Sequence, residues 1–93
     1  MKMNSAIKEQ LILHEGKKLK PYRCTSGKLT IGVGRNLDDN GISENEAMHM
    51  LDNDIVECMY DLMTIFGVNT WGCFSGNRQL GLIDLRFNVG PGS

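Results

Sequence analysis

The stretch LKPYRCTSGKLTIGVG, residues 19–34, decides the fold of the amino-terminal part of the chain. Residue types that favour β-strands stand on both sides of a turn signal, namely Tyr22, Leu29, Thr30, Ile31 and Val33. The turn signal is Thr-Ser-Gly-Lys at residues 25–28, so we predict two short extended segments joined by a tight turn. The glycines at 32 and 34 indicate positive φ or a close backbone approach. Without a complete GxGxxG in a βαβ unit, they are not a nucleotide-binding fingerprint.

Residues before this stretch follow helical periodicity. Residues 5–15 predict a short amphipathic helix that Asn4 or Ser5 caps and Gly16 ends. Glu15 then stands in the last helical turn. The C-terminal end of a helix disfavours negative charge, and this suits a carboxyl group that acts as a general acid.

A long helix is predicted after a polar connection at residues 35–41. Residues 43–46, Ser-Glu-Asn-Glu, form a capping box, and Ile42 stands in the position of a hydrophobic staple. Apolar residues at i, i+3, i+4 and i+7 then continue the helix from Glu44 to about Ile65. Gly67 is expected to end it.

The remaining residues predict more helical structure and complete an α+β fold. Residues 71–74 indicate a loop or short helical turn, and residues 77–87 a last helix. Residues 88–93 form a breaker sequence. We expect one domain, with a helix and β lobe at 1–42, a long helix at 43–66 and part of a helical lobe at 67–93.

Composition fits one small globular domain. The chain has 93 residues, of which 41% are hydrophobic and 23% charged, and this excludes collagen-like, coiled-coil and wholly disordered proteins. Three cysteines without metal-ligand spacing argue against a zinc site and against a complete disulfide framework. We expect no stable membrane insertion and no cleavable signal peptide, because no apolar run is long enough for either.

Charge divides unevenly along the sequence. Residues 1–35 hold eight Lys and Arg against two Glu, a balance of +6, and the rest holds two basic against nine acidic residues, a balance of −7. Clustered cations attract an anionic partner, such as nucleic acid, lipid head groups or a cell-wall polymer. The alternative is that the two halves pack together and neutralise each other.

Three polar residues are candidates for chemistry: Glu15 at a helix end, Cys24 beside the turn and Thr30 in the second strand. A strand pair with a tight turn brings Cys24 and Thr30 near each other, and the helix end can hold Glu15 across a groove. Spacing alone supports this weakly. His14 and His49 are expected to be surface or packing residues.

The sequence resembles a known family in several segments: residues 14–16 (HEG), 19–22 (LKPY), 25–37 (TSGKLTIGVGRNL), 41–43 (GIS), 46–47 (EA), 77–79 (NRQ) and 87–90 (FNVG). They resemble the phage-type (T4-like) lysozymes, the endolysins of glycoside hydrolase family 24. The resemblance covers nearly the whole chain. It implies a lysozyme-like fold and a muramidase that hydrolyses the β-1,4 bond between N-acetylmuramic acid and N-acetylglucosamine in peptidoglycan.

The family's catalytic triad, as the resemblance implies it, is Glu, eight residues, Asp or Cys, five residues, Thr. It falls on Glu15, Cys24 and Thr30 with both spacings intact. The resemblance also implies that Gly34 and Asn88 line the cleft and contact substrate, and that no cofactor or metal is needed. Peptidoglycan is then the expected partner, and nucleic acid is not.

Cys24 is the departure, because the best-studied members of the family carry Asp there. A thiol with an ordinary pKa near about 8.5 is mostly neutral at pH 7 and is a feeble base. If Arg23 and Lys28 lower that pKa, Cys24 can act as base or nucleophile. Otherwise Thr30 and the electrostatics of the groove carry the second role, and Cys24 is a small buried hydrophobe.

The resemblance further implies several helices after residue 93, which complete the C-terminal lobe and supply an Arg partner for the catalytic Glu. Without them we expect an exposed apolar face on the long helix and on residues 80–87, and self-association through that face. A phage or prophage endolysin of this kind waits in the host bacterial cytoplasm and causes cell lysis after release. Two alternatives stay open: a catalytically silent module that binds cell wall or a protein, and a redox sensor built on Cys24.

Overall fold

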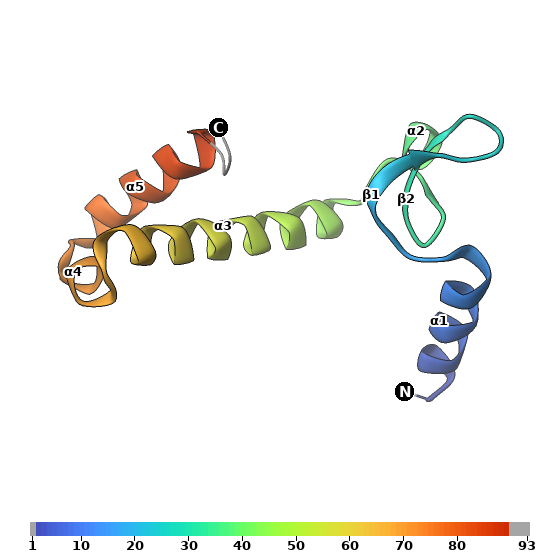
Figure 1. Cartoon of the computed structure of the whole chain (residues 1–93), viewed down its shortest axis with the longest axis horizontal. Helices are drawn as coiled ribbons and strands as arrows, with labels where there is room; N and C mark the ends of the chain where they lie inside the picture. The colour runs from blue at the N-terminus through green and yellow to red at the C-terminus, as the bar shows by residue number, and fades with distance from the viewer. Residues whose placement is uncertain (1, 90–93) are drawn as a thin grey trace. The chain divides into compact units, whose positions relative to one another are not determined.

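The computed structural model describes the backbone of residues 2–89 and the side chains of residues 5–89. The fold is α+β, as predicted (Figure 1). In chain order the elements are α1 (Lys2–Glu15), β1 (Lys18–Arg23), β2 (Leu29–Gly32), β3 (Arg35–Asn36), α2 (Leu37–Asn40), α3 (Glu44–Phe66), α4 (Val68–Cys73) and α5 (Gly76–Val89). They form two compact units, Met1–Ser43 and Glu44–Ser93. The assignment of the chain to one domain stays a prediction, and Gly90 and the residues after it lie outside the described residues.

The first unit contains a three-stranded antiparallel sheet in the order β1-β2-β3. Tyr22 pairs with Thr30 across β1 and β2, and the register shifts between Lys18 and Tyr22. Ile31 pairs with Arg35 across β2 and β3. The two predicted strands are therefore confirmed, and β3 is an addition.

Residues 35–41 are not the irregular polar connection that we predicted, because they form β3 and the short helix α2. Asn36 is the N-cap of α2, and its Oδ1 accepts a hydrogen bond from the Asp39 N–H at 3.0 Å. Gly41 ends α2 at φ 60°, and its N–H donates to the Leu37 carbonyl at 3.0 Å. Asn is a preferred N-cap residue, so the start of α2 could have been predicted from the sequence.

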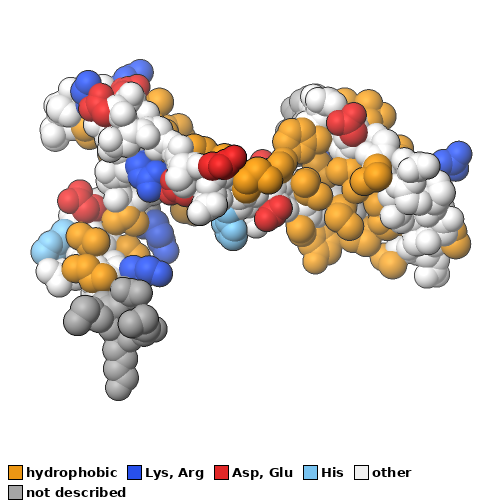
Figure 2. Space-filling view, turned by 180° about the vertical axis from the view of Figure 1, so that it is seen from behind, with side chains coloured by type: hydrophobic (Ala, Val, Ile, Leu, Met, Phe, Trp, Pro, Cys, Tyr) orange, Lys and Arg blue, Asp and Glu red, His pale blue; other side chains and the backbone are white. Residues whose placement is uncertain are grey.

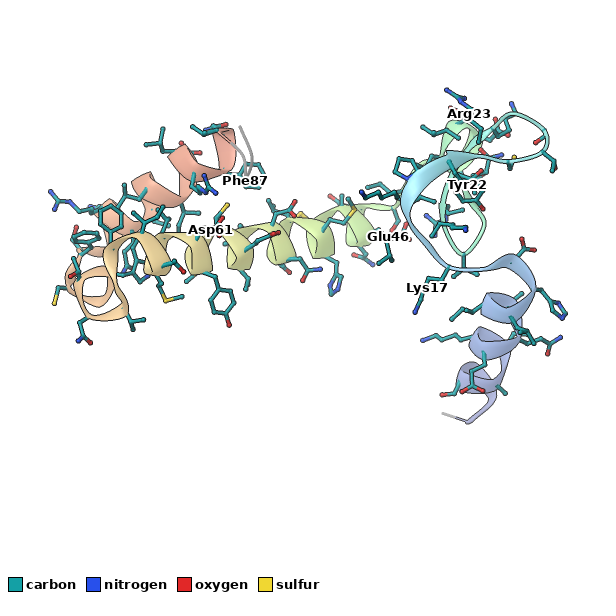
Figure 3. All side chains as sticks on the ribbon, in the orientation of Figure 1. Lys17, Tyr22, Arg23, Glu46, Asp61 and Phe87 are labelled. Carbon is teal, nitrogen blue, oxygen red and sulfur yellow. The ribbon has the colours of Figure 1, made fainter. Side chains whose placement is uncertain are left out.

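Polar contacts hold α2 against the hairpin. Asp38 Oδ2 accepts a hydrogen bond from the Leu29 N–H at 2.7 Å and lies 3.7 Å from Arg23 Nη1. Lys28 Nζ lies 3.3 Å from Asp39 Oδ1. Arg23 projects from the end of β1 (Figure 3). These side chains are partly exposed, so the backbone hydrogen bond to Asp38 contributes more than the ion pairs.

Glycine ends the two longest predicted helices, as expected. Gly16 follows α1 at φ 77°, and its N–H donates to the Ile12 carbonyl at 2.7 Å. Gly67 follows α3 at φ 85°, and its N–H donates to the Met63 carbonyl at 2.8 Å. A residue at positive φ just after a helix is favoured when it has no Cβ. Because Gly16 ends α1, Glu15 is the last residue of that helix.

The second unit is a helical hairpin in which α3 and α5 run side by side with α4 at their joint (Figure 1). Its buried apolar side chains are Cys58, Leu62 and Trp71, each 5% exposed. The Trp71 and Phe74 rings meet edge to face at 6.1 Å between centroids. The segment 71–74 is therefore a short helical turn, one of the two forms expected.

Apolar side chains also gather on the surface of the second unit (Figure 2). Ile65 on α3 is 65% exposed, and Leu80 and Leu85 on α5 are 66% and 60% exposed. This is the exposed apolar face that the sequence led us to expect. Within residues 2–89, each helix is too short or too polar to cross a bilayer.

Asp38→Ala should lower the free energy of unfolding by about 1–2 kcal/mol, because the Leu29 N–H loses a charged acceptor. Urea denaturation measures the loss, and faster hydrogen exchange at the Leu29 amide locates it. Asp52→Ala is the control, since Asp52 is an exposed carboxylate without a hydrogen bond to the described residues. Equal losses in both variants would contradict the role of Asp38.

Candidate active site

Glu15 lies exposed at the C-terminal end of α1. Its side chain reaches the turn between β2 and β3. A Cβ atom placed on Gly34 in that turn would lie 3.3 Å from Glu15 Oε2. Glu15 has no ion-pair partner among the described residues. The carboxyl group is therefore accessible, uncompensated by a cation and set against a glycine.

Cys24 lies directly after β1, at the start of the hairpin turn. Its N–H donates to the Lys28 carbonyl at 3.0 Å, and its own carbonyl accepts from the Gly27 N–H at 2.8 Å. Gly27 has φ 81°, which allows the chain to reverse here. Cys24 is half-buried, whereas the core cysteine of the chain is Cys58.

Thr30 lies in β2 and is only 4% exposed. Its hydroxyl donates to the Lys28 carbonyl at 2.9 Å, so this buried polar group is satisfied. The same hydroxyl contributes to the lowered pKa of Cys24. The structure thus brings Cys24 and Thr30 together, as the strand pair predicted.

Hydrogen bonds lower the pKa of the Cys24 thiol from 9.0 to about 7. The largest cause is the Ser26 hydroxyl, whose Oγ lies 3.1 Å from Cys24 Sγ. The backbone of Ser26, the backbone of Lys28 and the Thr30 hydroxyl add to this effect, and slight burial opposes it. A substantial fraction of Cys24 is therefore thiolate near pH 7.

The positive charge of Arg23 and Lys28, one of the alternatives that the sequence left open, is not among the causes of this pKa shift. Arg23 Nη1 donates to the Gly27 carbonyl at 3.2 Å, and Lys28 Nζ pairs with Asp39. Lys28 acts on Cys24 through its backbone, and charge is absent among the causes. Ser26, which the sequence analysis did not single out, is the residue that tunes the thiol. A serine two positions after a cysteine in a tight turn was the available signal.

Asn88 lies on α5, in the second unit. Its Nδ2 donates to the Asp84 carbonyl at 2.9 Å, a bond within the helix.

His14 and His49 are exposed, in agreement with a surface role. Among residues 5–89, no three His, Cys, Asp or Glu side chains gather as metal ligands would.

Hollows in the second unit lie between α3 and α5. One of them measures about 190 Å³ and is lined by Asp54, Glu57, Cys58, Asp61 and Phe87. Figure 3 labels Asp61 and Phe87, one on each helix. Asp61 Oδ2 is engaged there by Arg86 Nη2 at 3.0 Å. This hollow is therefore part of the packing between the two helices.

An α+β unit with a carboxylate at a helix end and a small hairpin sheet is consistent with a lysozyme-like fold. A family model described as Phage lysozyme matches residues 13–93, and the chain belongs to this family. A curated protein named "Probable T4-type lysozyme 2", from Dictyostelium discoideum, is 40% identical over 53 residues. The match covers 57% of this chain and 31% of that relative.

Ser26→Ala should raise the pKa of Cys24 from about 7 toward its ordinary 9.0, because the thiolate loses its strongest hydrogen-bond partner. The pH dependence of Cys24 alkylation by iodoacetamide measures this, in a Cys73→Ser background that removes the other exposed thiol. Thr25→Ala is the control in the same turn. An unchanged alkylation midpoint in Ser26→Ala would refute the assignment.

Proposed function

We propose that the chain is a muramidase that hydrolyses the β-1,4 bond between N-acetylmuramic acid and N-acetylglucosamine in peptidoglycan and so causes bacterial lysis. The observation that carries the proposal is the presence, in one unit of a phage lysozyme family member, of an accessible Glu15 at a helix end and a thiol of lowered pKa. The chain spans about a third of the curated relative that it matches.

Glu15 is proposed as the general acid. Glycoside hydrolysis needs one group that protonates the leaving oxygen and a second that activates water or attacks the sugar. Glu15 is the last residue of α1 and has the required access to solvent. The proton passes from this carboxyl to the glycosidic oxygen as that bond breaks.

Cys24 is proposed for the second role. A thiolate with a pKa of about 7 can take a proton from the water that attacks the anomeric carbon. The Ser26 hydroxyl lies 3.1 Å from the sulfur, and the Thr30 hydroxyl adds to the lowering of its pKa. Analysis of the product anomers decides between base and nucleophile, since a covalent thioglycoside intermediate gives retained configuration and a base gives inverted configuration.

Substrate contacts, association and location stay predictions. We propose Gly34 and Asn88 as substrate contacts.

The exposed apolar face of α3 and α5 supports self-association of the chain. A stable, well-folded monomer in a sedimentation experiment would exclude self-association. Release from the cytoplasm of a host bacterium, with a phage or prophage origin, is proposed from the resemblance alone.

The second candidate is a catalytically silent lysozyme-like module that binds cell wall or a protein partner. The observation that favours it is the exposed apolar face of the second unit, which suits a binding surface. An activity assay separates the two candidates, because only the muramidase depends on the carboxyl group of Glu15.

Glu15→Gln should reduce the rate of lysis about 10²–10⁴-fold, because the amide cannot donate the proton that the leaving oxygen needs. Turbidity of outer-membrane-permeabilised cells measures the rate. Glu9→Gln, on the same helix and also exposed, is the matched control and should keep full activity. Lysis by neither the parent chain nor the variants would favour the silent module.

Cys24→Asp should keep activity and shift the rising limb of the pH–rate profile to lower pH. A base works when deprotonated, so activity with the thiol rises as pH passes through about 7. An aspartate, with an ordinary pKa of about 3.9, is deprotonated well below that value. Cys73→Ser, at an exposed cysteine of the second unit, should leave the profile unchanged. A rising limb that stays in place after Cys24→Asp would remove Cys24 from the mechanism.

A further inference from the structure

Gly34 differs from every other glycine that the structure describes. The three atoms nearest to a Cβ built on it all belong to the Glu15 side chain: Oε2 at 3.3 Å, Cδ at 3.6 Å and Cγ at 3.7 Å. A Cβ built on any of the other described glycines would meet nothing within that distance. A side chain at position 34 would therefore occupy the space beside the carboxyl group of Glu15.

Backbone conformation alone does not account for this contact. Gly34 has φ 72°, a value that favours glycine, but Gly32, the last residue of β2, has φ 69°. Both positions therefore share the conformational demand, and only Gly34 faces Glu15. The two effects can be separated by comparing the same substitution at each position.

The turn that holds Gly34 is fixed on both sides. β2 ends at Gly32 and β3 begins at Arg35, so only residues 33 and 34 form the connection between these strands. Two-residue hairpin loops are built from a small set of turn types. A side chain at position 34 therefore cannot move away with its backbone, and the Glu15 carboxyl group has to move instead.

We propose that Gly34 is a positioning residue for Glu15: its missing side chain admits the carboxyl group against the β2–β3 turn, in the orientation from which it protonates the substrate. The inference rests on the proposed role of Glu15 as general acid. Glu15 has no ion pair with a described residue to hold it, so the turn supplies its neighbouring surface. Small displacements of a catalytic group strongly lower the rate of the chemical step.

A Cβ atom at 3.3 Å forces the carboxylate oxygen to shift by a few tenths of an ångström. The proposed role of the Glu15 carboxyl group is to transfer a proton in the transition state. Its displacement should therefore slow the chemical step without weakening substrate binding. The expected signature is therefore a loss in kcat with KM unchanged. A glycine that only contacts substrate would give the opposite pattern, a raised KM with kcat preserved.

The test compares Gly34→Ala with Gly32→Ala in the full chain, using soluble peptidoglycan fragments as substrate. We expect kcat to fall about 10- to 100-fold in Gly34→Ala, with KM within about two-fold of the parent value. Gly32→Ala carries the same backbone strain and should keep a kcat at least about ten times higher than Gly34→Ala. Equal losses of kcat, or a loss that appears only in KM, would overturn the proposal.

A second readout does not depend on activity. The carboxyl ¹³C resonance of Glu15 should move in Gly34→Ala and stay in place in Gly32→Ala. Gly34→Asn and Gly32→Asn repeat the comparison with a residue that adopts positive φ more readily, so the fold is retained if alanine disrupts it. A Glu15 resonance unmoved in both Gly34 variants would refute the positioning role. If the parent chain lacks muramidase activity, the proposed function fails, while this resonance still reports the contact.

Discussion

The carbonyl oxygen of Lys28 accepts two hydrogen bonds, and the arrangement of the candidate site depends on both. The Cys24 N–H reaches it at 3.0 Å and closes the hairpin turn, and the Thr30 hydroxyl reaches it at 2.9 Å from the next strand. One acceptor therefore ties the thiol and the threonine to the same point. The turn also brings Ser26 to the sulfur, and these hydrogen bonds stabilise the thiolate where a distant cation would be screened by solvent.

Charge in the first unit is partly neutralised within that unit. The carboxylates of α2 engage Arg23 and Lys28, the two cations that the sequence analysis weighed as neighbours of Cys24. Lys17, Lys18 and Lys20 form no ion pair with the described residues and stay exposed. Three uncompensated lysines directly after Glu15 give this side of the unit a positive potential, and such a potential raises the local concentration of an anionic polymer.

Two glycines define the surroundings of Glu15 by different means. Gly16 ends α1 at positive φ, so the carboxylate stands at the helix terminus with free access to solvent. Gly34 lies far from Glu15 in the sequence, and because it has no Cβ it leaves room for the Glu15 carboxyl group beside it. The helix end and the β2–β3 turn thereby form one local site, although they come from separate parts of the first unit. The second unit contributes a helical hairpin with a small core around Trp71.

Local patterns in the sequence were enough for the hairpin, the glycine ends of α1 and α3, the long helix and the spacing of Glu15, Cys24 and Thr30. Each depends on neighbours a few residues apart, where propensity, capping and turn chemistry act directly. The sequence missed β3 and α2, because the Asn36 cap was read as part of a polar loop. The contact of Ser26 with Cys24 is local to the turn and was overlooked in the sequence. Only the tertiary structure decided that Gly34 borders Glu15, since this contact joins the end of α1 to a turn that lies far from it in the sequence.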